Sequence, residues 1–380
     1  MLQAKSFCDT LVALGINLFT GVPDSLLKQF CAYLEKGASN QSFKHIIAAN
    51  EGAAVGLAIG HHLATSSVPL VYMQNSGLGN VVNPLTSLAD SEVYQIPLLL
   101  MIGWRGEPTV KDEPQHIKQG RITPALLDTL EIPYEVLDPD ETMANEQVSH
   151  LIGLARSQKK PCALLVRKNS FEVLSSKKKK ESTKKVEALF TREEAIHTIV
   201  KNIDQDTRIV STTGMASREL YEYRDSCQQG HALDFLTVGG MGHASQIALG
   251  LAQVKSARPI LCLDGDGASL MHMGSLAIIG QSAAKNLLHV VLNNGAHDSV
   301  GGQATVARAI DLPAIAKACG YAWVNRCDSQ SSLVACLPDF LSATGPAFLE
   351  VLIDKGNRKD LGRPKESPAE NKVAFMDGLL

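Results

Sequence analysis

The chain has 380 residues, of which 45% are hydrophobic and 20% charged, and its formal net charge is −3 at pH 7. This length accommodates two ordinary domains, and the composition is typical of a globular protein. The net charge gives no overall basic field for binding nucleic acid. The mean hydropathy of +0.01 and the absence of an apolar run of about 18 residues argue against a membrane protein. The eight cysteines form no CxxC pair, which favours free thiols in the reducing cytoplasm over disulfides or a zinc site.

The first half of the chain alternates short apolar runs with helix-length segments. We predict strands at residues 16–20, 45–48, 70–73, 98–102, 134–137 and 163–166, with a helix over 51–63. Strands and helices that alternate at this spacing are typical of parallel βαβ units. The sequence therefore predicts an α/β domain over residues 1–174.

Residues 175–185 read SSKKKKESTKK, a polar and positively charged run without apolar periodicity. A lysine run can bind nucleic acid or acidic lipid, but a solvated linker explains it more simply. A helix start follows at Thr191-Arg192-Glu193-Glu194, which has the pattern of a capping box. We predict a linker over residues 175–190 and a second domain over 191–380.

The second half repeats the alternation, with predicted strands at residues 208–211, 259–263, 288–292 and 348–353. Two of these strands run into polar loops, Asp264-Gly265-Asp266-Gly267 and Asn293-Asn294-Gly295. Ligands of parallel α/β sheets bind at the carboxyl ends of strands. A carboxylate and an amide oxygen are hard ligands suited to magnesium, which usually bridges protein carboxylates to phosphates. The glycines allow close approach of the backbone to such a phosphate.

A GDG turn alone is common, and so is an NNG turn. The pairing of the two, with 28 positions from Asp266 to Asn294, resembles the motif of the thiamine-diphosphate-dependent enzymes. That resemblance implies a cofactor-binding loop of Gly265, Asp266 and Gly267. It also implies that the side chains of Asp266 and Asn294 and the backbone carbonyl of Ala296 bind Mg²⁺.

Two further segments are similar to this family. Glu51, in Asn50-Glu51-Gly52, matches the catalytic glutamate that contacts N1′ of the cofactor's aminopyrimidine; alone, it would be a glutamate at a helix N-terminus. In Val238-Gly239-Gly240-Met241-Gly242-His243, Met241 matches the apolar residue that bends the cofactor, and the carbonyl of Gly239 would accept from the 4′-amino group. Without the other motifs, Met241 would be a core residue.

The resemblance implies two domains of thiamine-diphosphate-binding fold, one for the pyrimidine and one for the diphosphate, each a parallel sheet flanked by helices. The short linker leaves no middle domain. It also implies a homo-oligomer with active sites between subunits and non-oxidative decarboxylation of a small 2-oxo acid, in which the cofactor performs the difficult step.

The two-domain arrangement resembles the phosphonopyruvate and sulfopyruvate decarboxylases. The runs at residues 21–27 (GVPDSLL), 103–108 (GWRGEP), 111–116 (KDEPQH) and 294–303 (NGAHDSVGGQ) favour the former. The implied reaction converts phosphonopyruvate to phosphonoacetaldehyde and carbon dioxide in phosphonate biosynthesis. Sulfopyruvate decarboxylation is one alternative, and a non-catalytic subunit that retains the fold is another.

A phosphonate requires cations or other hydrogen-bond donors for recognition. Candidate substrate-binding residues gather in one segment punctuated by Gly and Pro, although each could instead be a solvated surface charge: Arg105, Lys111, His116 and Lys118. Asp24 and Ser25, which follow the first predicted strand, are candidates for proton transfer.

Overall fold

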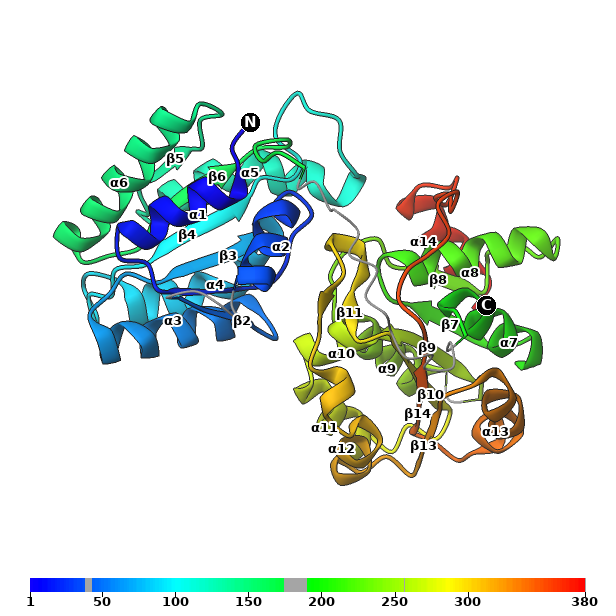
Figure 1. Ribbon diagram of the computed structural model, residues 1–380. Coiled ribbons are helices and arrows are strands. Elements are labelled where there is room, and N and C mark those ends of the chain that lie inside the picture. Colours follow the sequence, from blue (N-terminus) through cyan, green and yellow to red (C-terminus); the bar gives the residue numbers. More distant parts are fainter. Residues whose placement is uncertain (38–42, 174–189, 256, 380) are drawn as a thin grey trace, which may run out of the picture. The chain divides into compact units, whose positions relative to one another are not determined.

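The computed structural model describes residues 1–37, 43–173, 190–255 and 257–379 (Figure 1). The chain divides into two compact units, Met1–Lys180 and Glu181–Leu380. Of the linker predicted at residues 175–190, all but residue 190 lies outside the described residues. Within the described ranges, no helix has the length and apolar character needed to cross a membrane.

The first unit contains a six-stranded sheet in the order β2-β1-β3-β4-β6-β5, and all its strand pairs are parallel. Each strand overlaps a run predicted from the sequence. The strands are β1 (Leu18–Gly21), β2 (Lys44–Ile47), β3 (Leu70–Gln74), β4 (Leu99–Gly103), β5 (Tyr134–Val136) and β6 (Cys162–Val166). The helices are α1 (Ala4–Ala13), α2 (Lys28–Gly37), α3 (Glu51–Thr65), α4 (Leu78–Pro84), α5 (Pro114–Thr129) and α6 (Glu141–Gln158).

Two hydrophobic clusters sandwich this sheet, because alternate strand residues face opposite sides. In β3, Leu70 and Tyr72 pack into a cluster with α1, α2 and α6. Val71 and Met73 pack into another cluster with α3, α4 and α5. Burial on both faces explains why the sequence shows continuous apolar runs rather than polar–apolar alternation.

The second unit has its own parallel six-stranded sheet, in the order β13-β14-β10-β9-β7-β8. Its strands are β7 (Arg208–Ser211), β8 (Asp234–Leu236), β9 (Ile260–Gly265), β10 (Leu287–Asn293), β13 (Trp323–Cys327) and β14 (Ala347–Leu352). A short antiparallel hairpin joins β11 (Ala296–His297) to β12 (Gln303–Ala304). The helices are α7 (Arg192–Asn202), α8 (Met215–Ser226), α9 (Ala244–Val254), α10 (Asp266–Met271), α11 (Gly274–Gln281), α12 (Leu312–Cys319), α13 (Gln330–Ser342) and α14 (Pro368–Asp377).

Helices cover both faces of this second sheet as well. One cluster joins α7, α8 and α13 to Leu261 and Leu263 of β9, and the other joins α9, α11 and α12 to Ile260 and Cys262 of the same strand. The predicted capping box is confirmed, since the Thr191 side chain accepts from the backbone N–H of Glu194 at the start of α7. The predicted fold class, two α/β units built on parallel sheets, is therefore confirmed.

The two edge strands of the second sheet, β8 and β13, were not predicted from the sequence. β8 has three residues and begins with Asp234, whose buried carboxylate pairs with Arg224. β13 carries two exposed polar residues, Asn325 and Arg326. Both strands therefore lack the continuous apolar run that marks the central strands.

Candidate active site

The two polar loops of the second unit emerge at the same edge of its sheet. β9 and β10 are parallel neighbours, and Leu292 pairs with Gly265. Asp266 directly follows Gly265, and Asn294 is the second residue after Leu292. The register therefore brings the loops that carry these two predicted metal ligands to one end of the sheet.

Asp266 begins α10 and is 3% exposed. One of its carboxylate oxygens, Oδ2, accepts a hydrogen bond from the Thr305 hydroxyl at 2.5 Å. The β11–β12 hairpin returns the chain to this point, since the Thr305 N–H donates to the Gly295 carbonyl at 3.0 Å. Burial raises the pKa of Asp266 to about 6, although hydrogen bonds from Thr305 and the Gly267 backbone act to lower it. A buried carboxylate of this kind is a site where a cation would replace the proton.

Asn294, 5% exposed, is held at both ends of its amide. Its Nδ2 donates to Oδ2 of Asp298 at 2.6 Å, and its Oδ1 accepts from the Ala296 N–H at 2.9 Å. The turn from Asn294 to Ala296 requires a glycine at position 295, where φ is +65° and a Cβ would lie 2.8 Å from the Arg308 side chain. The amide oxygen has a second lone pair that can serve a metal ion.

Gly267 leaves room for two side chains beside the Asp266 loop. A Cβ at Gly267 would lie 3.0 Å from the His297 ring and 3.2 Å from Cε of Met241. Met241, the residue predicted to bend the cofactor, therefore lies next to the predicted metal-binding loop. Burial lowers the pKa of the nearby His297 to about 4. His297 was not singled out in the sequence, although it lies in the run from Asn294 to Gln303.

The loop that carries Gly239 and Met241 is built on glycines in the left-handed region. Gly240 has φ +67° and Gly242 has φ +85°, and a Cβ at Gly242 would lie 2.5 Å from the His272 ring. The Cβ would clash there, so a side chain would strain the turn that presents Met241.

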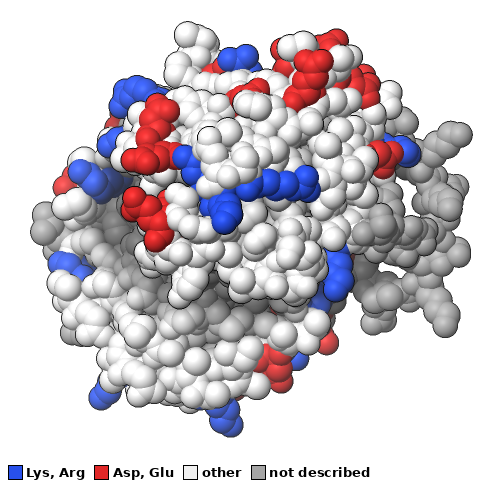
Figure 2. Space-filling model, turned by 90° about the vertical axis from the view of Figure 1, so that its left-hand side faces the viewer, with Lys and Arg blue, Asp and Glu red and all other residues white. Residues whose placement is uncertain are grey.

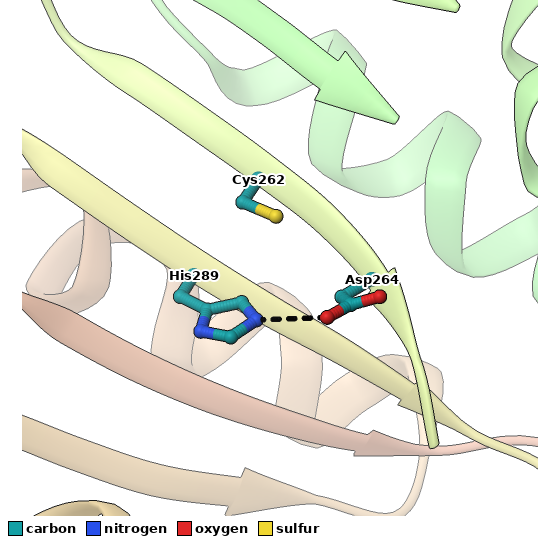
Figure 3. A group of neighbouring side chains, drawn as sticks. All are labelled: Cys262, Asp264 and His289. Atoms are coloured by element: carbon teal, nitrogen blue, oxygen red, sulfur yellow. Dashed lines mark ion pairs between the residues drawn. The ribbon is translucent and has the colours of Figure 1, made fainter. Parts of the chain in front are cut away.

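A cluster of three side chains lies on the neighbouring strands β9 and β10, shortly before the Asp266 loop (Figure 3). Figure 3 shows His289 pointing at Asp264 with Cys262 beside them, and the ligand atoms of all three lie within 4.8 Å of one another. His289 Nε2 is 3.4 Å from Asp264 Oδ2, and Nδ1 is 2.9 Å from the Tyr321 hydroxyl. Burial raises the pKa of the Cys262 thiol well above its usual range, which disfavours the thiolate that metals bind. Because Asp264 Oδ1 accepts from the Gly265 N–H at 2.9 Å, we interpret the cluster as a support for the predicted metal-binding turn.

In the first unit, Glu51 begins α3 directly after its N-cap Asn50 and is 5% exposed. Oε2 accepts from Nδ2 of Asn80 at 2.7 Å. Gly77 makes this packing possible, because a Cβ there would lie 2.5 Å from Oε1 of Glu51. The helix N-terminus favours the negative charge of a buried carboxylate.

Asp24 and Ser25 follow β1, at the sheet edge where β3 and β4 also end. Asp24 is fully buried, and its carboxylate accepts from Nε2 of Gln74 at 2.7 Å and from the Leu26 N–H at 2.9 Å. A Cβ at Gly103 would lie 2.2 Å from Asp24 Oδ2. Asp24 is therefore fixed by its surroundings, while the Ser25 hydroxyl accepts from Nη1 of Arg105 at 2.7 Å.

Arg105 forms a bidentate ion pair with Asp112, with Nε to Oδ2 at 2.8 Å and Nη2 to Oδ1 at 2.5 Å. The buried side chain of His116 is hydrogen-bonded to the same carboxylate, with Nδ1 at 2.9 Å from Asp112 Oδ1. Although burial acts to raise it, the hydrogen bonds from Arg105 and His116 hold the pKa of Asp112 well below its usual range. The structure thus gathers Ser25, Arg105 and His116 into one network.

The two lysines of the same segment differ from Arg105. Lys111 and Lys118 are exposed, and within the described ranges neither side chain has a hydrogen-bond or ion-pair partner. Of the four predicted cations, the structure therefore joins only Arg105 and His116 through a shared partner, Asp112. Asp112, the acidic hub of this network, was present in the quoted run from Lys111 to His116 but was not singled out.

The contacts described above fit a magnesium-held diphosphate in the second unit. Asp266 and Asn294 have hard oxygen atoms that could bind such an ion, and Gly267 leaves space that a side chain would fill. In the first unit, Glu51 offers a buried carboxylate suited to a polar nitrogen heterocycle. Thr305, which holds Asp266, was missed because it lies outside the quoted runs. Asp298, which holds Asn294, lies in the quoted run from Asn294 to Gln303 but was not singled out.

Comparison with known proteins identifies both units. Residues 1–128 match the N-terminal TPP-binding domain of thiamine pyrophosphate enzymes, and residues 212–351 match their C-terminal TPP-binding domain. Glu51 lies in the first matched segment, and Asp266 and Asn294 lie in the second.

Three relatives match nearly the whole chain. A phosphonopyruvate decarboxylase of Streptomyces viridochromogenes is 37% identical, over 97% of this chain and 93% of its own length. A phosphonopyruvate decarboxylase of Streptomyces hygroscopicus is 35% identical, over 99% and 94%. A sulfopyruvate decarboxylase of Methanosarcina acetivorans is 29% identical, over 96% and 94%.

Proposed function

The chain belongs to the thiamine pyrophosphate enzymes, and from this premise we propose that it is a carboxy-lyase that converts phosphonopyruvate to phosphonoacetaldehyde and carbon dioxide. The observation that carries the proposal is the 37% identity, over 97% of the chain, with a phosphonopyruvate decarboxylase. Such a reaction belongs to the biosynthesis of phosphonates.

Two TPP-binding domains make thiamine diphosphate the cofactor. We propose that Mg²⁺ holds its diphosphate through the side chains of Asp266 and Asn294 and the carbonyl of Ala296. Gly265 and Gly267 would let the backbone approach the phosphates. When bound, thiamine diphosphate supplies the electron sink that decarboxylation of a 2-oxo acid needs.

Glu51 would hold a proton shared with N1′ of the aminopyrimidine. Its burial, its position at the N-terminus of α3 and its contact with Asn80 support this role, because they fix the carboxylate in one orientation. Met241 would support the bend of the cofactor, and the Gly239 carbonyl would accept from the 4′-amino group. The assignment of Met241 is supported by its position next to Gly267, where an added Cβ would lie 3.2 Å from Cε of Met241.

Arg105 is the candidate for recognising the phosphonate. A guanidinium has five N–H groups, and Asp112 and Ser25 engage three of them through Nε, Nη2 and Nη1. Among the residues that the structure describes, none engages the other two N–H groups, which are left for a substrate oxygen, and Asp112 holds the guanidinium in a fixed plane. Lys111 and Lys118 would add only exposed charges. Asp24 and Ser25 are candidates for proton transfer at the same sheet edge.

We further propose a homo-oligomer whose active sites combine residues of two subunits. Residues 52–89, which cover α4 and all of α3 except its first residue Glu51, contain no Lys, Arg, Asp or Glu. Leu57 and Leu63 of α3 are nevertheless 40% and 71% exposed. Figure 2 faces the side on which α3 and α6 lie in Figure 1 and shows a broad uncharged area in its middle, below a band of charged side chains. An exposed apolar face of this kind is typical of a subunit interface.

A cytoplasmic location agrees with the cysteines. All eight are free, and six of them are buried. Such buried thiols are typical of a reducing compartment.

The decisive experiment compares release of aldehyde from phosphonopyruvate, sulfopyruvate and pyruvate with the same enzyme, thiamine diphosphate and Mg²⁺. We expect phosphonopyruvate to give the highest kcat/KM. A preference for sulfopyruvate would make the chain a sulfopyruvate decarboxylase, the function of its relative at 29% identity. Cofactor binding without turnover of any of the three substrates would favour a non-catalytic subunit.

A further inference from the structure

Asn294 makes two contacts that only one orientation of its amide can satisfy. Its Nδ2 faces a carboxylate oxygen of Asp298, and its Oδ1 faces the N–H of Ala296. If the amide turned over, its oxygen would face the Asp298 carboxylate, and its NH₂ would face the Ala296 N–H. Both hydrogen bonds would be lost, and like partial charges would meet in a buried site.

Asp298 is itself fixed by three donors that reach the same oxygen, Oδ2. Besides Asn294, these are the Gly356 N–H at 2.8 Å and Nη1 of Arg192 at 3.4 Å. Asp298 begins the 3-10 turn Asp298–Val300, directly after β11, and its side chain is 11% exposed. Because three donors hold the Asp298 carboxylate in place, the carboxylate fixes the orientation of the Asn294 amide.

Arg192 connects this contact to the rest of the unit. It begins α7, and its guanidinium grips Glu219 of α8 with Nε to Oε2 at 2.8 Å and Nη2 to Oε1 at 3.0 Å. The Arg192 and Glu219 side chains are 9% and 2% exposed. The orientation of Asn294 is therefore tied through Asp298 to α7, α8 and the segment that follows β14.

We propose that Asp298 is a positioning residue that keeps Oδ1 of Asn294 turned toward the metal ion. The inference rests on the proposed function, because it takes Asn294 as a ligand of the magnesium that holds the diphosphate. Groups that orient metal ligands by hydrogen bonds contribute about 10–100-fold to metal affinity. The step that Asp298 serves is metal and cofactor binding rather than the chemistry.

The test compares full-length Asp298→Asn and Asp298→Ala with wild type. Asparagine keeps the size of the side chain but can offer Asn294 either an acceptor or a donor, so the amide is no longer fixed in one orientation. Asp206→Asn is the matched control, since it removes one negative charge in the same unit from a residue that contacts Arg208 and Arg258 instead. Magnesium is titrated at saturating thiamine diphosphate, with the melting temperature and phosphonopyruvate turnover as separate readouts.

We expect half-saturating Mg²⁺ to rise about 10–100-fold in Asp298→Ala and less in Asp298→Asn, with no change in the control. At saturating Mg²⁺, kcat should return to within about twofold of wild type, a split that a general loss of structure does not produce. If Asp298→Ala does not fold, the isosteric asparagine variant decides. Half-saturation equal to the control, or kcat that stays low at saturating Mg²⁺, would overturn the inference.

Failure of this inference and failure of the proposed function give different results. A wild-type protein whose melting temperature does not respond to Mg²⁺ and thiamine diphosphate together would contradict the proposed function. A wild-type protein that responds, with Asp298 variants that respond at the same Mg²⁺ concentration, would contradict only the role of Asp298.

Discussion

Replacing Asp266 with asparagine should stabilise the metal-free protein and at the same time abolish metal-dependent cofactor binding. The carboxyl group is 3% exposed, and burial raises its pKa from 3.8 to about 6. At neutral pH the metal-free protein therefore keeps a buried charge that it would hold more favourably as a neutral acid. Asparagine is neutral at every pH and still offers an oxygen to the Thr305 hydroxyl.

The magnitude follows from the difference between the two pKa values. The shift is about two pH units, which corresponds to about 3 kcal/mol at about 1.4 kcal/mol per unit. Because the folded pKa is raised, the contribution of this group to stability is fully present below pH 3.8 and is lost as the pH rises through about 6. We therefore expect the free energy of unfolding of metal-free Asp266→Asn to exceed that of wild type by up to about 3 kcal/mol at pH 7.5 and by almost nothing at pH 4.

The assay is unfolding without metal or cofactor. The chain has two tryptophans, Trp104 in the first unit and Trp323 in the second, so removing Trp104 leaves a fluorescence probe in the unit that carries Asp266. A gain of about 3 kcal/mol should raise the melting temperature of a unit of this size by about 6–12 °C. With Mg²⁺ and thiamine diphosphate at about 100 times the dissociation constant, wild type should gain about 2.7 kcal/mol and the variant nothing.

Two results would refute this reasoning. A metal-free Asp266→Asn protein that is no more stable than wild type at pH 7.5 would show that the carboxylate is not penalised in the fold. A variant that still responds to Mg²⁺ and thiamine diphosphate would show that Asp266 is not a metal ligand. Asp206→Asn is the control in both cases, because Asp206 is 58% exposed and should change neither result.

Three further predictions address the first unit, the substrate and the core. Glu51→Gln should bind thiamine diphosphate as wild type does but decarboxylate about 10²–10⁴-fold more slowly at saturating cofactor; near-normal turnover would contradict the assignment. Arg105→Ala should lower kcat/KM for phosphonopyruvate by about 10–100-fold, the effect of about 1.5–3 kcal/mol per charged hydrogen bond, and leave residual pyruvate activity unchanged. An equal fall for both substrates would instead assign Arg105 to the fold. Asp234→Ala should lower the free energy of unfolding by about 3–5 kcal/mol, because it leaves the buried Arg224 without its bidentate partner at 2.9 Å; a loss below about 1 kcal/mol in denaturant unfolding would contradict this.

The sequence by itself determined the central part of both sheets. All six strands of the first sheet overlap runs predicted from the sequence. The signal is clearest in β3, β4 and β6, because central parallel strands that are covered on both faces are mostly apolar. The same logic predicted that the loops after β9 and β10 share an edge, and the register of Leu292 with Gly265 bears this out. Local rules were sufficient at the start of α7, where Thr191 and Glu194 lie three positions apart.

The edge strands of the second sheet and the side-chain partners were decided only by the tertiary structure. β8 is a strand because β7 pairs with it and because Asn371 of α14 accepts from the Leu236 N–H at 3.1 Å. The density of positive charge after Trp104 did not reveal that Arg105 forms an ion pair with Asp112 while Lys118 faces solvent. Both side chains are cations, and only the folded chain separates them, with Arg105 in the loop after β4 and Lys118 on α5.

The contacts that fix the proposed metal ligands could not be predicted from the sequence either. Asp266 and Thr305 are 39 positions apart, and Arg192 and Asp298 are 106 positions apart. A ligand can be recognised from its motif because the type of side chain and its place after a strand are local properties. The residue that orients it depends on strand register and on where a hairpin returns the chain. The number of positions between two residues in the sequence does not tell whether their side chains meet in space.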